Sequence, residues 1–411
     1  MKRMKPHTIV SINLGNFGST GSVVRNVLNA ATEQGYCTFK AFPRDEKEEP
    51  FEENDIIISS TIAKKISQRI CRYLGLNGCG AFFATKRLLG KFKKIKPSVI
   101  HLHNLHNSYI NLPMLFRYIK RHNIAIVWTL HDCWSFTGQC PHFTFIKCDG
   151  WKTGCGKCPQ YKNYPEAAYD NTKQMFRLKR KWFTGIKNMT IVTPSEWLAR
   201  LVKESFLNEY PVRVIHNGID LEIFRPLESN FREKHQISKE KFVLLGVAFD
   251  WGMKKGLDVF CKLYELLDKD AYQIVLVGVN ETTKRELPEG IITISRTSNQ
   301  SELAKIYTAA DVFINPTRED TFPTVNMESI ACGTPVFTFA TGGSPEIIDE
   351  KTGVIVPCDD IEKMYSCILE LSKTKKFTMG DCLGKAKEYD KKIAFEQYVR
   401  LFDSVIEEYR L

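Results

Sequence analysis

Two carboxylates, Asp320 and Glu328, are the residues whose types and spacing point most directly to chemistry. Asp320 stands in a loop that contains Pro323, and Glu328 stands just inside the start of an expected helix. A helix start attracts anions, because its backbone N–H groups are free and the positive end of its dipole lies there. A ligand with a phosphate in the middle and hydroxyl groups at both ends, such as a nucleotide-sugar, suits this arrangement. The alternative is an ordinary loop–helix junction with solvated acids, and the longer pattern D-x-F-P-x4-E-x2-A-C-G-T-P-V from Asp320 to Val336 favours the ligand site.

A pair of lysines in the second half of the chain could neutralise such a phosphate. Lys254 and Lys255 lie in the segment from Gly246 to Leu257, which follows an expected strand and begins a helix. A lysine at this point can stabilise a diphosphate, although it could also be a solvated helix-start residue. Arg296 follows the next strands and is either a ligand contact or an exposed loop arginine.

The first half offers a glycine-rich turn and two groups of histidines. The turn runs from Gly15 to Ser22, and its glycines let the backbone approach a phosphate closely, but its spacing is neither the dinucleotide fingerprint nor a Walker A loop. His101, His103 and His106 leave one strand end, and no carboxylate near them supports a metal site, so they could be polar lining. His131 ends the next strand, where its imidazole could hydrogen-bond developing charge or serve only the structure.

Cysteines cluster between Cys133 and Cys158. Cys155 and Cys158 flank a compact Gly-Lys turn that suits two thiolates on one tetrahedral metal ion, and Cys140 and Cys148 would complete a closed structural site. Cys133 or His142 could substitute for one ligand. Structural zinc is the favoured interpretation, and reduced thiols, disulfides and an iron–sulfur cluster remain open.

Short apolar runs that alternate with helical stretches are expected to position these residues. This alternation is typical of parallel α/β folds. The expected strands of the first half are 7–14, 98–102, 125–130, 189–193 and 212–216, and those of the second half are 242–247, 273–277, 291–294, 312–315, 334–339 and 353–356. A helix is expected over 256–267, the polar segment 220–240 is the best linker candidate, and 394–411 is an amphipathic helix. Two α/β halves place a cleft at the carboxyl ends of their strands.

Composition and charge limit the class of protein and its partners. The 411 residues are 43% hydrophobic and 26% charged, as in soluble globular proteins, and no apolar run reaches the roughly 18 residues that span a bilayer. The N-terminal residues resemble a first strand rather than a signal peptide, so we expect a cytoplasmic protein.

The net charge of +11 is unevenly distributed. Residues 56–131 contain no Asp or Glu but thirteen Lys and Arg, interleaved with apolar residues. An anionic membrane surface suits this composition, a basic surface with no specific partner is the alternative, and nucleic acid is not expected because no nucleic-acid-binding motif accompanies the charge.

The chain resembles the family-4 retaining glycosyltransferases. The stretch from Asp320 to Pro335 is similar to their E-x7-E signature with Asp in place of the first Glu, and Lys255-Gly256, His131 and the run from His216 to Asp220 support it in order. The cysteine-rich segment resembles an insertion of one bacterial subgroup linked to surface polysaccharide synthesis, such as capsule or exopolysaccharide.

This resemblance implies a GT-B fold: α/β, with two Rossmann-like domains whose parallel sheets face each other across a cleft. The domains would be an acceptor-side domain over 1–225 with its insertion at about 133–160, a nucleotide-sugar-binding domain over 226–390, and a helix over 391–411 that returns to the first domain. It also implies transfer of a sugar, with retention, from a UDP- or GDP-sugar to a growing, lipid-linked polysaccharide at the inner face of the plasma membrane, without a catalytic metal.

The resemblance also implies individual roles. Glu328 would hold the ribose, Asp320 the donor sugar, Lys255 the departing diphosphate, and His131 the sugar and phosphate; further donor contacts, from the base to the sugar, would come from Gly21, Arg296, Phe322 and Thr324, and the acceptor side would include His103 and His106.

Three residues depart from the family pattern: Asp320 for Glu, Phe249 for the phosphate-binding Arg, and Pro323 for Gly. The shorter Asp320 leaves the donor sugar open, and Lys254 is the one candidate to compensate for the missing arginine.

Two other classes of function fit parts of the sequence. A nucleotide-sugar epimerase of the same fold would convert the donor without an acceptor, and would need acid–base groups at the reacting carbon. A non-catalytic, zinc-stabilised binding protein would show no turnover.

Overall fold

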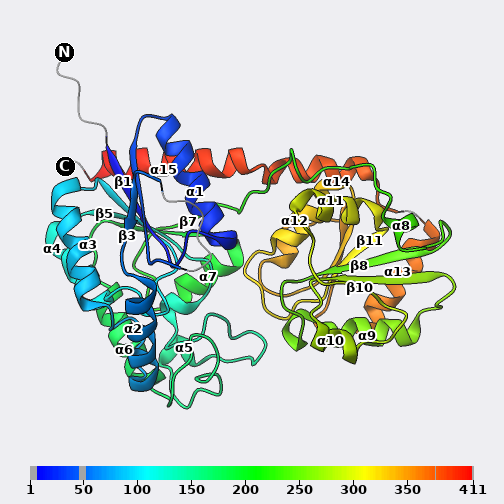
Figure 1. Cartoon of the computed structure of the whole chain (residues 1–411), viewed down its shortest axis with the longest axis horizontal. Coiled ribbons are helices and arrows are strands. Elements are labelled where there is room, and N and C mark those ends of the chain that lie inside the picture. The colour runs from blue at the N-terminus through cyan, green and yellow to red at the C-terminus, as the bar shows by residue number, and fades with distance from the viewer. Residues whose placement is uncertain (1–6, 46–51, 375, 410–411) are drawn as a thin grey trace. The chain divides into compact units, whose positions relative to one another are not determined.

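The computed structural model describes residues 7–45, 52–374 and 376–409, and the chain divides into two compact units. The first comprises Met1–Ile215 and Phe395–Leu411, and the second comprises His216–Ala394 (Figure 1). The first unit thus ends at Ile215, before the expected boundary at residue 225. The expected linker over 220–240 is wrong, because Phe224, Phe231 and Ile237 are buried in the core of the second unit.

The first unit is built on a seven-stranded sheet with all strands parallel, in the order β3-β2-β1-β4-β5-β6-β7. The strands are β1 (Thr8–Ile12), β2 (Cys37–Phe42), β3 (Asp55–Ile57), β4 (Val99–Leu102), β5 (Ala125–Thr129), β6 (Met189–Thr193) and β7 (Val212–Val214). β4, β5 and β6 are buried along their whole length, which explains why they are continuous apolar runs in the sequence.

Strands β2 and β3 were missed, because they are short and carry charges. Lys40 of β2 is buried beside Asp55 of β3, with 3.4 Å between Nζ and Oδ1. This ion pair lets a strand with a polar appearance lie inside the sheet.

Helices connect the strands of the first unit. They are α1 (Gly18–Glu33), α2 (Thr61–Leu74), α3 (Phe82–Ile95), α4 (Leu112–His122), α5 (Gly150–Thr153), α6 (Thr172–Phe183) and α7 (Glu196–Glu204), with a short 3₁₀ turn η1 (Trp134–Phe136). The cysteine-rich segment between β5 and α6 contains only η1 and α5.

The second unit has a six-stranded parallel sheet in the order β10-β9-β8-β11-β12-β13. The strands are β8 (Phe242–Val247), β9 (Tyr272–Val277), β10 (Ile292–Ile294), β11 (Val312–Asn315), β12 (Val336–Phe339) and β13 (Gly353–Val356). The helices are α8 (Phe231–Lys234), α9 (Leu257–Leu266), α10 (Glu281–Glu286), α11 (Gln300–Ala309), α12 (Thr324–Ala331), α13 (Ile361–Thr374) and α14 (Met379–Ala386), with the 3₁₀ turns η2 (Met253–Lys255), η3 (Ser344–Glu346) and η4 (Lys387–Tyr389). The fold class is therefore confirmed: each unit is a parallel α/β sheet with Rossmann-like strand order.

The last helix, α15 (Lys391–Glu408), begins in the second unit and ends in the first. Its start is joined to the second unit, where Ile219 pairs with Asp390 and the Lys391 ammonium contacts the Asp220 carboxylate. Gly218 is required at this point, because a Cβ there would lie 2.4 Å from the Lys391 Cα. None of the helices within the described residues combines the length and apolarity of a membrane span.

Candidate active site

In the second unit three of the predicted charged residues, Lys254, Lys255 and Asp320, lie in loops where the strand order reverses, between β8 and β11. The loops that follow adjacent parallel strands diverge at such a point and leave room for a ligand at the carboxyl edge of the sheet. The loop after β8 carries Lys254 and Lys255, and the loop after β11 carries Asp320. Gly256 lies between them with φ of +74°, and a Cβ there would lie 2.4 Å from the Pro316 carbonyl oxygen.

Lys255 and Asp320 form an ion pair, with 2.8 Å between Nζ and Oδ2. Both side chains are partly exposed, so a ligand could reach either group. Lys254 pairs with the buried Glu319 at 2.6 Å, so the proposed replacement for the missing arginine is already bound to a carboxylate of its own. Phe249, which stands at the arginine position, is 95% exposed.

Arg318, which the sequence analysis missed, holds the two loops together. Its guanidinium binds both carboxylate oxygens of Asp258 at 2.7 and 2.8 Å and one oxygen of Asp359 at 2.6 Å. The same group donates to the Met253 carbonyl, and the Arg318 N–H donates to the Lys254 carbonyl at 2.8 Å. The loop that presents Lys255 is therefore fixed from both sides. A single arginine two residues before Asp320 gave no signal in the sequence.

Glu328 lies in the second turn of α12 and has its own hydrogen-bond partners. Its carboxylate accepts a hydrogen bond from the Tyr307 hydroxyl at 3.2 Å and another from Thr324. Burial raises the pKa of Glu328 to about 7, although these two hydrogen bonds favour the charged form. The carboxyl is thus poised to lose its proton when a ligand offers hydroxyl donors.

The remaining predicted donor contacts have separate positions. Thr324 is the first residue of α12, whose N-cap residue Pro323 gives no side-chain cap. The Phe322 N–H donates to Asp320 Oδ1 at 3.3 Å, and the Phe322 ring is buried and stacked on His216 with 4.8 Å between ring centroids. Arg296 is exposed in the loop after β10.

In the first unit the corresponding reversal of strand order lies between β1 and β4. Asn13, which follows β1, donates to the Gly15 carbonyl at 2.8 Å and accepts from the Asn104 N–H at 3.3 Å, so it joins the two loops. Gly21 lies buried in the first turn of α1, where a Cβ would be 2.6 Å from the Asn16 carbonyl carbon. Close packing of the helix on this loop is therefore one reason for glycine at this position.

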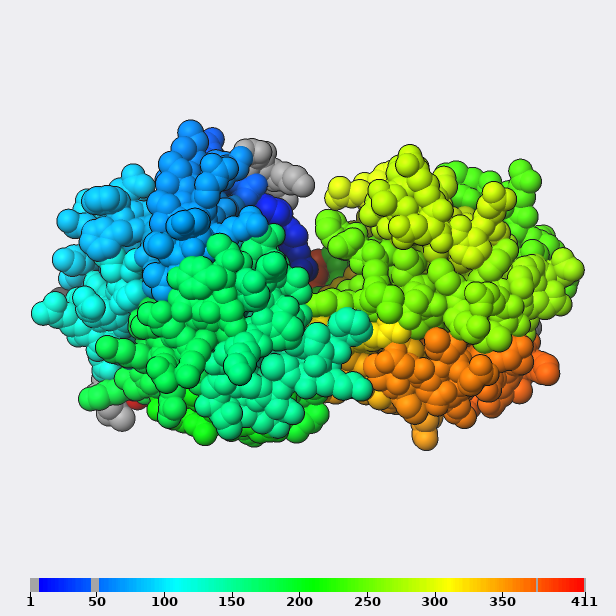
Figure 2. Space-filling model, turned by 90° about the horizontal axis from the view of Figure 1, so that it is seen from below, coloured from blue at the N-terminus to red at the C-terminus, as the bar shows by residue number. Residues whose placement is uncertain are grey.

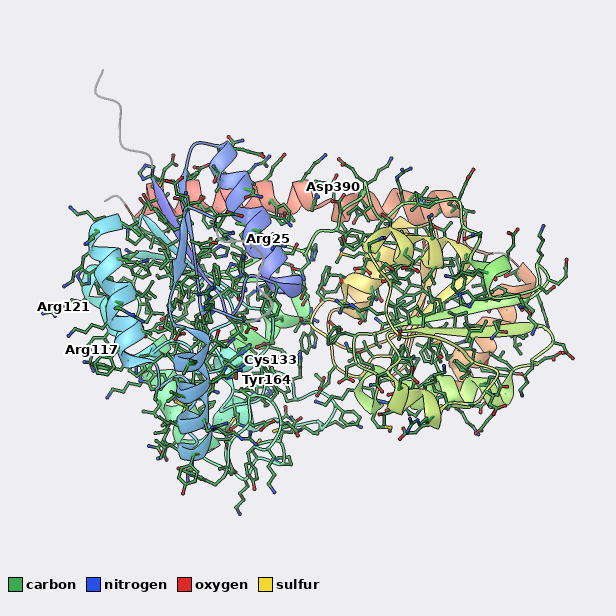
Figure 3. All side chains as sticks on the ribbon, in the orientation of Figure 1. Arg25, Arg117, Arg121, Cys133, Tyr164 and Asp390 are labelled. Atoms are coloured by element: carbon green, nitrogen blue, oxygen red, sulfur yellow. The ribbon has the colours of Figure 1, made fainter. Side chains whose placement is uncertain are left out.

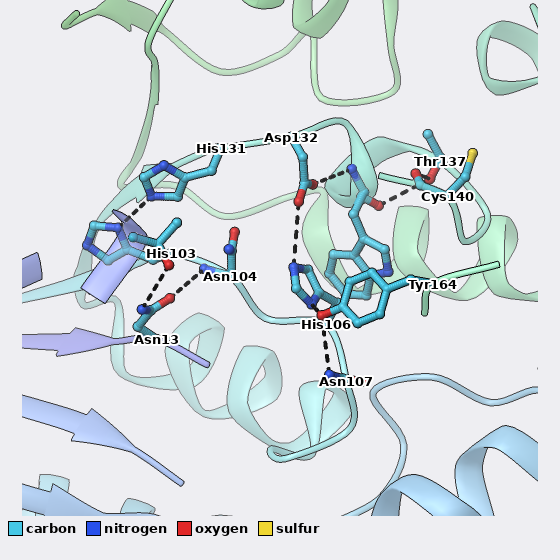
Figure 4. A network of polar contacts seen from close by, with 12 residues as sticks. Asn13, His103, Asn104, His106, Asn107, His131, Asp132, Thr137, Cys140 and Tyr164 are labelled. Atoms are coloured by element: carbon cyan, nitrogen blue, oxygen red, sulfur yellow. Dashed lines mark hydrogen bonds and ion pairs between the residues drawn. The ribbon is translucent and has the colours of Figure 1, made fainter. Parts of the chain in front are cut away.

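Three histidines form a hydrogen-bonded row at the same edge, and Figure 4 shows the contact between two of them, His131 and His103. His131 Nε2 lies 3.0 Å from His103 Nδ1, and His103 Nε2 lies 3.3 Å from His101 Nδ1. His101 Nε2 lies 2.9 Å from the Thr129 hydroxyl, which donates at 3.2 Å to the hydroxyl of Tyr398 on α15.

The row is electrically neutral. Burial lowers the pKa of His101 to about 3 and that of His131 to about 4, and it lowers the pKa of His103 well below its ordinary value. A neutral imidazole has one N–H, so all the bonds of the row must run in the same direction. The tautomer of His131 is thus coupled to the hydroxyls of Thr129 and Tyr398 at the other end of the row. Tyr398 therefore belongs to the site, although it was not predicted because it lies in the last helix, far away in the sequence.

His106 does not belong to this row and forms a second group (Figure 4). Its Nε2 lies 3.5 Å from Asp132 Oδ2, and the Tyr164 hydroxyl lies 2.8 Å from its Nδ1. Asp132 also accepts a hydrogen bond from the Trp134 N–H at 2.8 Å. Burial raises the pKa of Asp132, but the hydrogen bonds and the positive charge of His106 outweigh this effect, so the pKa lies below its usual value. The predicted acceptor residues His103 and His106 therefore face different partners.

The four predicted cysteine ligands line one small cavity of about 50 Å³ beside Trp151. The Gly138 N–H donates to Cys155 Sγ at 3.1 Å, and the Gln160 N–H donates to Cys158. All thirteen cysteines are free thiols, so the disulfide interpretation is wrong. In the part of the chain that the structure describes, no group of three or more His, Cys, Asp or Glu is arranged to hold a metal ion, and the zinc site stays a prediction.

A buried lysine, Lys179, holds the start of the cysteine-rich segment in place. Lys179 of α6 donates to the Trp134 carbonyl at 2.6 Å and to the Thr137 carbonyl at 3.1 Å, and its ammonium lies 3.5 Å from the centre of the Trp134 ring. Burial lowers the pKa of Lys179 to about 7. These contacts tie the start of the cysteine-rich segment to α6, and Figure 3 shows Cys133 and Tyr164 in the same part of the unit.

A separate cavity of about 360 Å³ opens beside the glycine-rich turn of the first unit. It is lined by Gly15, Phe17 and Thr20 of that turn and by polar residues of α2, among them Lys64, Lys65 and Gln68. Lys64 is paired with Asp45 at 2.5 Å. The cavity can hold a polar ligand of the size of a sugar.

Solved structures of the same architecture define the class of fold as GT-B. The chain superimposes on sucrose-phosphate synthase from Thermosynechococcus elongatus with a TM-score of 0.72 at 16% identity, covering 98% of this chain and all of that one. It also superimposes on HepE of Anabaena in complex with UDP-glucose, with a TM-score of 0.66 at 12% identity over 97% of this chain and 99% of that one.

Sequence comparisons then define the family. The model of Glycosyltransferase Family 4 matches residues 20–223, and the model of Glycosyl transferases group 1 matches residues 239–374. A relative in Escherichia coli (strain K12), named as the colanic acid biosynthesis glycosyl transferase WcaC, is 26% identical over 323 residues, which are 75% of this chain and 77% of the relative. The chain belongs to the family-4 glycosyltransferases and is a glycosyltransferase with a GT-B fold.

Proposed function

We propose that this enzyme transfers a sugar, with retention of configuration, from a UDP- or GDP-sugar to a growing surface polysaccharide. The observation that carries the proposal is the Lys255–Asp320 pair at the reversal of strand order, close in sequence to the start of α12, with the perturbed carboxyl of Glu328 on the same helix. A cation, uncapped helix N–H groups and two carboxylates match the parts of a nucleotide-sugar.

The roles follow from this chemistry. Glu328 would accept hydrogen bonds from the ribose hydroxyls, and Asp320 would bind hydroxyls of the donor sugar. Lys255 would stabilise the diphosphate as it departs, and its pair with Asp320 keeps it in place before the donor binds. Phe322 and Thr324 would contribute backbone N–H groups near the sugar or phosphate. Gly21 of the first unit would add a backbone contact, and Arg296 would meet the base.

In the reaction the bond between the anomeric carbon and the phosphate oxygen breaks, and a bond to the acceptor hydroxyl oxygen forms on the same face. The acceptor proton passes to the departing phosphate oxygen. His131, held neutral by burial, would hydrogen-bond the sugar and the phosphate and orient them. In this proposal Lys255 and the helix N-terminus supply the charge stabilisation and no catalytic metal takes part, so adding Mg²⁺ or Mn²⁺ should leave the rate unchanged.

The acceptor is proposed to be a lipid-linked glycan. The cavity beside the glycine-rich turn would receive its sugar end, because Lys64, Lys65 and the glycine-rich turn line it. His103 and His106, which do not line this cavity, would also belong to the acceptor side. The relative WcaC is named for colanic acid biosynthesis, which supports a surface polysaccharide such as a capsule or an exopolysaccharide as the product. The enzyme would then work at the inner face of the plasma membrane.

A structural zinc ion is proposed for the cysteine-rich segment. Cys140, Cys148, Cys155 and Cys158 line one cavity, and the N–H groups directed at two of the sulfur atoms resemble those that stabilise metal thiolates. Metal analysis of the purified protein should find one zinc per chain. The Cys155→Ser and Cys158→Ser variants should lose it, whereas Cys261→Ser in the second unit should keep it.

The test of the proposed function is release of nucleoside diphosphate from a panel of UDP- and GDP-sugars, with membrane lipid extract as acceptor. Release from one donor that depends on the lipid and is lost in Glu328→Gln supports a transferase. Conversion of the donor to an isomer without an acceptor would instead indicate an epimerase. No release by a folded protein that binds no nucleotide would indicate a binding protein.

A further inference from the structure

Helix α2 has an apolar outer face that is exposed to solvent in the described part of the chain. The helix begins after Ser60, whose hydroxyl accepts from the Ala63 N–H at 3.3 Å, and it ends at Gly75, which has φ of +58°. Its buried residues are Ser67 and Cys71, one turn apart, so one narrow face packs on the first unit. Figure 2 shows this part of the chain, in blue, at the surface of the first unit.

The outer face carries a stripe of large apolar side chains. Ile62, Ile66, Ile70 and Tyr73 follow each other at a spacing of one helical turn, and they are 73, 55, 53 and 75% exposed. Single exposed apolar residues are common, but a continuous stripe of this kind marks a surface that binds a protein partner or a membrane.

The charged residues of α2 itself are all basic: Lys64 pairs with Asp45 and Arg72 pairs with Glu166, so two of the four positive charges have acidic partners. Lys65 and Arg69 of α2 are exposed beside it, and residues 56–131 contain no Asp or Glu. Elsewhere on the same unit, α4 carries the exposed Arg117 and Arg121, which point outward at the left edge of Figure 3. Like charges would oppose the docking of a second copy on this face, whereas an anionic surface complements it.

We infer that α2 docks the first unit on an anionic lipid bilayer. Ile62, Ile66, Ile70 and Tyr73 enter the boundary between headgroups and acyl chains, and Lys65 and Arg69 meet the lipid phosphates. Lys65 also lines the cavity beside the glycine-rich turn, so docking brings that cavity to the membrane surface. The inference deepens the proposed membrane partner, but it can be tested without any sugar transfer.

The experiment is co-sedimentation of the full chain with vesicles of phosphatidylcholine alone and of phosphatidylcholine with about a third phosphatidylglycerol. The wild type should bind the anionic vesicles, and binding should weaken at high salt. The double variant Ile66→Ser/Ile70→Ser should bind at least tenfold more weakly, and Lys65→Gln/Arg69→Gln should lose about fivefold for each charge. The matched controls in the second unit, Ile355→Ser and Arg285→Gln, should bind like the wild type.

Three outcomes would overturn the inference: no binding, equal binding to neutral vesicles, or full binding by Ile66→Ser/Ile70→Ser. A dimer in sedimentation velocity that this variant dissociates, without vesicle binding, would assign the face to a second copy instead. Circular dichroism verifies that the variants are folded. Vesicle binding without release of nucleoside diphosphate from any donor would leave this inference standing and refute the proposed function.

Discussion

The two units use the same sheet topology to build two different kinds of polar site. In the second unit the reversal of strand order carries charges: Lys255 pairs with Asp320, and Arg318 fixes their loops. In the first unit the equivalent edge carries His101, His103 and His131, which burial keeps neutral. Under the proposed function, the charged edge stabilises the diphosphate through Lys255, and the neutral edge orients the sugar and the phosphate through uncharged hydrogen bonds from His131.

The largest expected effect on kcat comes from a substitution at the charged edge. Lys255→Met should lower kcat by about 10²–10³-fold, because removal of one group that stabilises charge in the transition state has an effect of this size. Lys254→Met is the matched control and should lose less than about tenfold, since that ammonium pairs with Glu319, which has no proposed contact with the donor. Equal losses in steady-state kinetics would show that Lys255 has no special role.

The next effect breaks the neutral edge. His131→Ala should lower kcat by about 10²-fold through loss of a positioned hydrogen bond. Tyr398→Phe removes only the far end of the row and should lower kcat by less than about tenfold, with the KM for the donor unchanged. If Tyr398→Phe changes KM and leaves kcat intact, the row does not set the tautomer of His131.

Acid should destabilise the first unit through the same histidines. Their pKa values in the folded protein lie below the unfolded value of about 6.5, so the unfolded chain binds more protons and stability falls as the pH drops below 6.5. At pH 5.5 each buried imidazole should lower the free energy of unfolding by about 1.4 kcal/mol relative to pH 7.5.

Urea unfolding of the wild type and of His101→Gln/His103→Gln at the two pH values measures this. The difference between pH 5.5 and pH 7.5 should shrink in the variant. An unchanged difference would contradict the neutral row.

The smallest of these effects concerns proton release by Glu328. Its pKa of about 7 in the free enzyme means that ribose hydroxyls must displace a proton at lower pH. Affinity for the nucleoside diphosphate should therefore rise about tenfold from pH 6 to pH 8. The ligand phosphate titrates in the same range, so Glu328→Gln is the control, and calorimetry should show a smaller rise for this variant.

The sequence predicted the charged edge better than the neutral one for a physical reason. Asp320, Pro323 and Glu328 are contiguous in the chain, so their pattern can be recognised before the fold is known. The row at His131 is assembled from β4, β5 and α15, and only the sheet brings Tyr398 to Thr129. The role of Arg318 was not predicted for a related reason. Its guanidinium binds Asp258 and Asp359, which are distant from it in the sequence.

The fold was predicted where burial dominates. Fully buried strands such as Met189–Thr193 were placed at their observed bounds, because an apolar run between polar turns has few other structures. β2 was missed because its buried Lys40 depends on Asp55, a partner from another strand. The linker was wrongly placed over 220–240 because polar residues dominate this segment. Its three buried apolar residues, Phe224, Phe231 and Ile237, are too widely spaced to form an apolar run.

The division of labour between the two units is tested most directly by binding of the nucleoside diphosphate to variants of each. Calorimetric titration with the UDP or GDP of the active donor should give a Kd for His131→Ala within about twofold of the wild type, whereas Glu328→Gln and Lys255→Met should each weaken binding by at least about tenfold. The reverse pattern, with nucleotide affinity lost at His131 and kept at Glu328 and Lys255, would contradict the assignment of the charged edge to the donor.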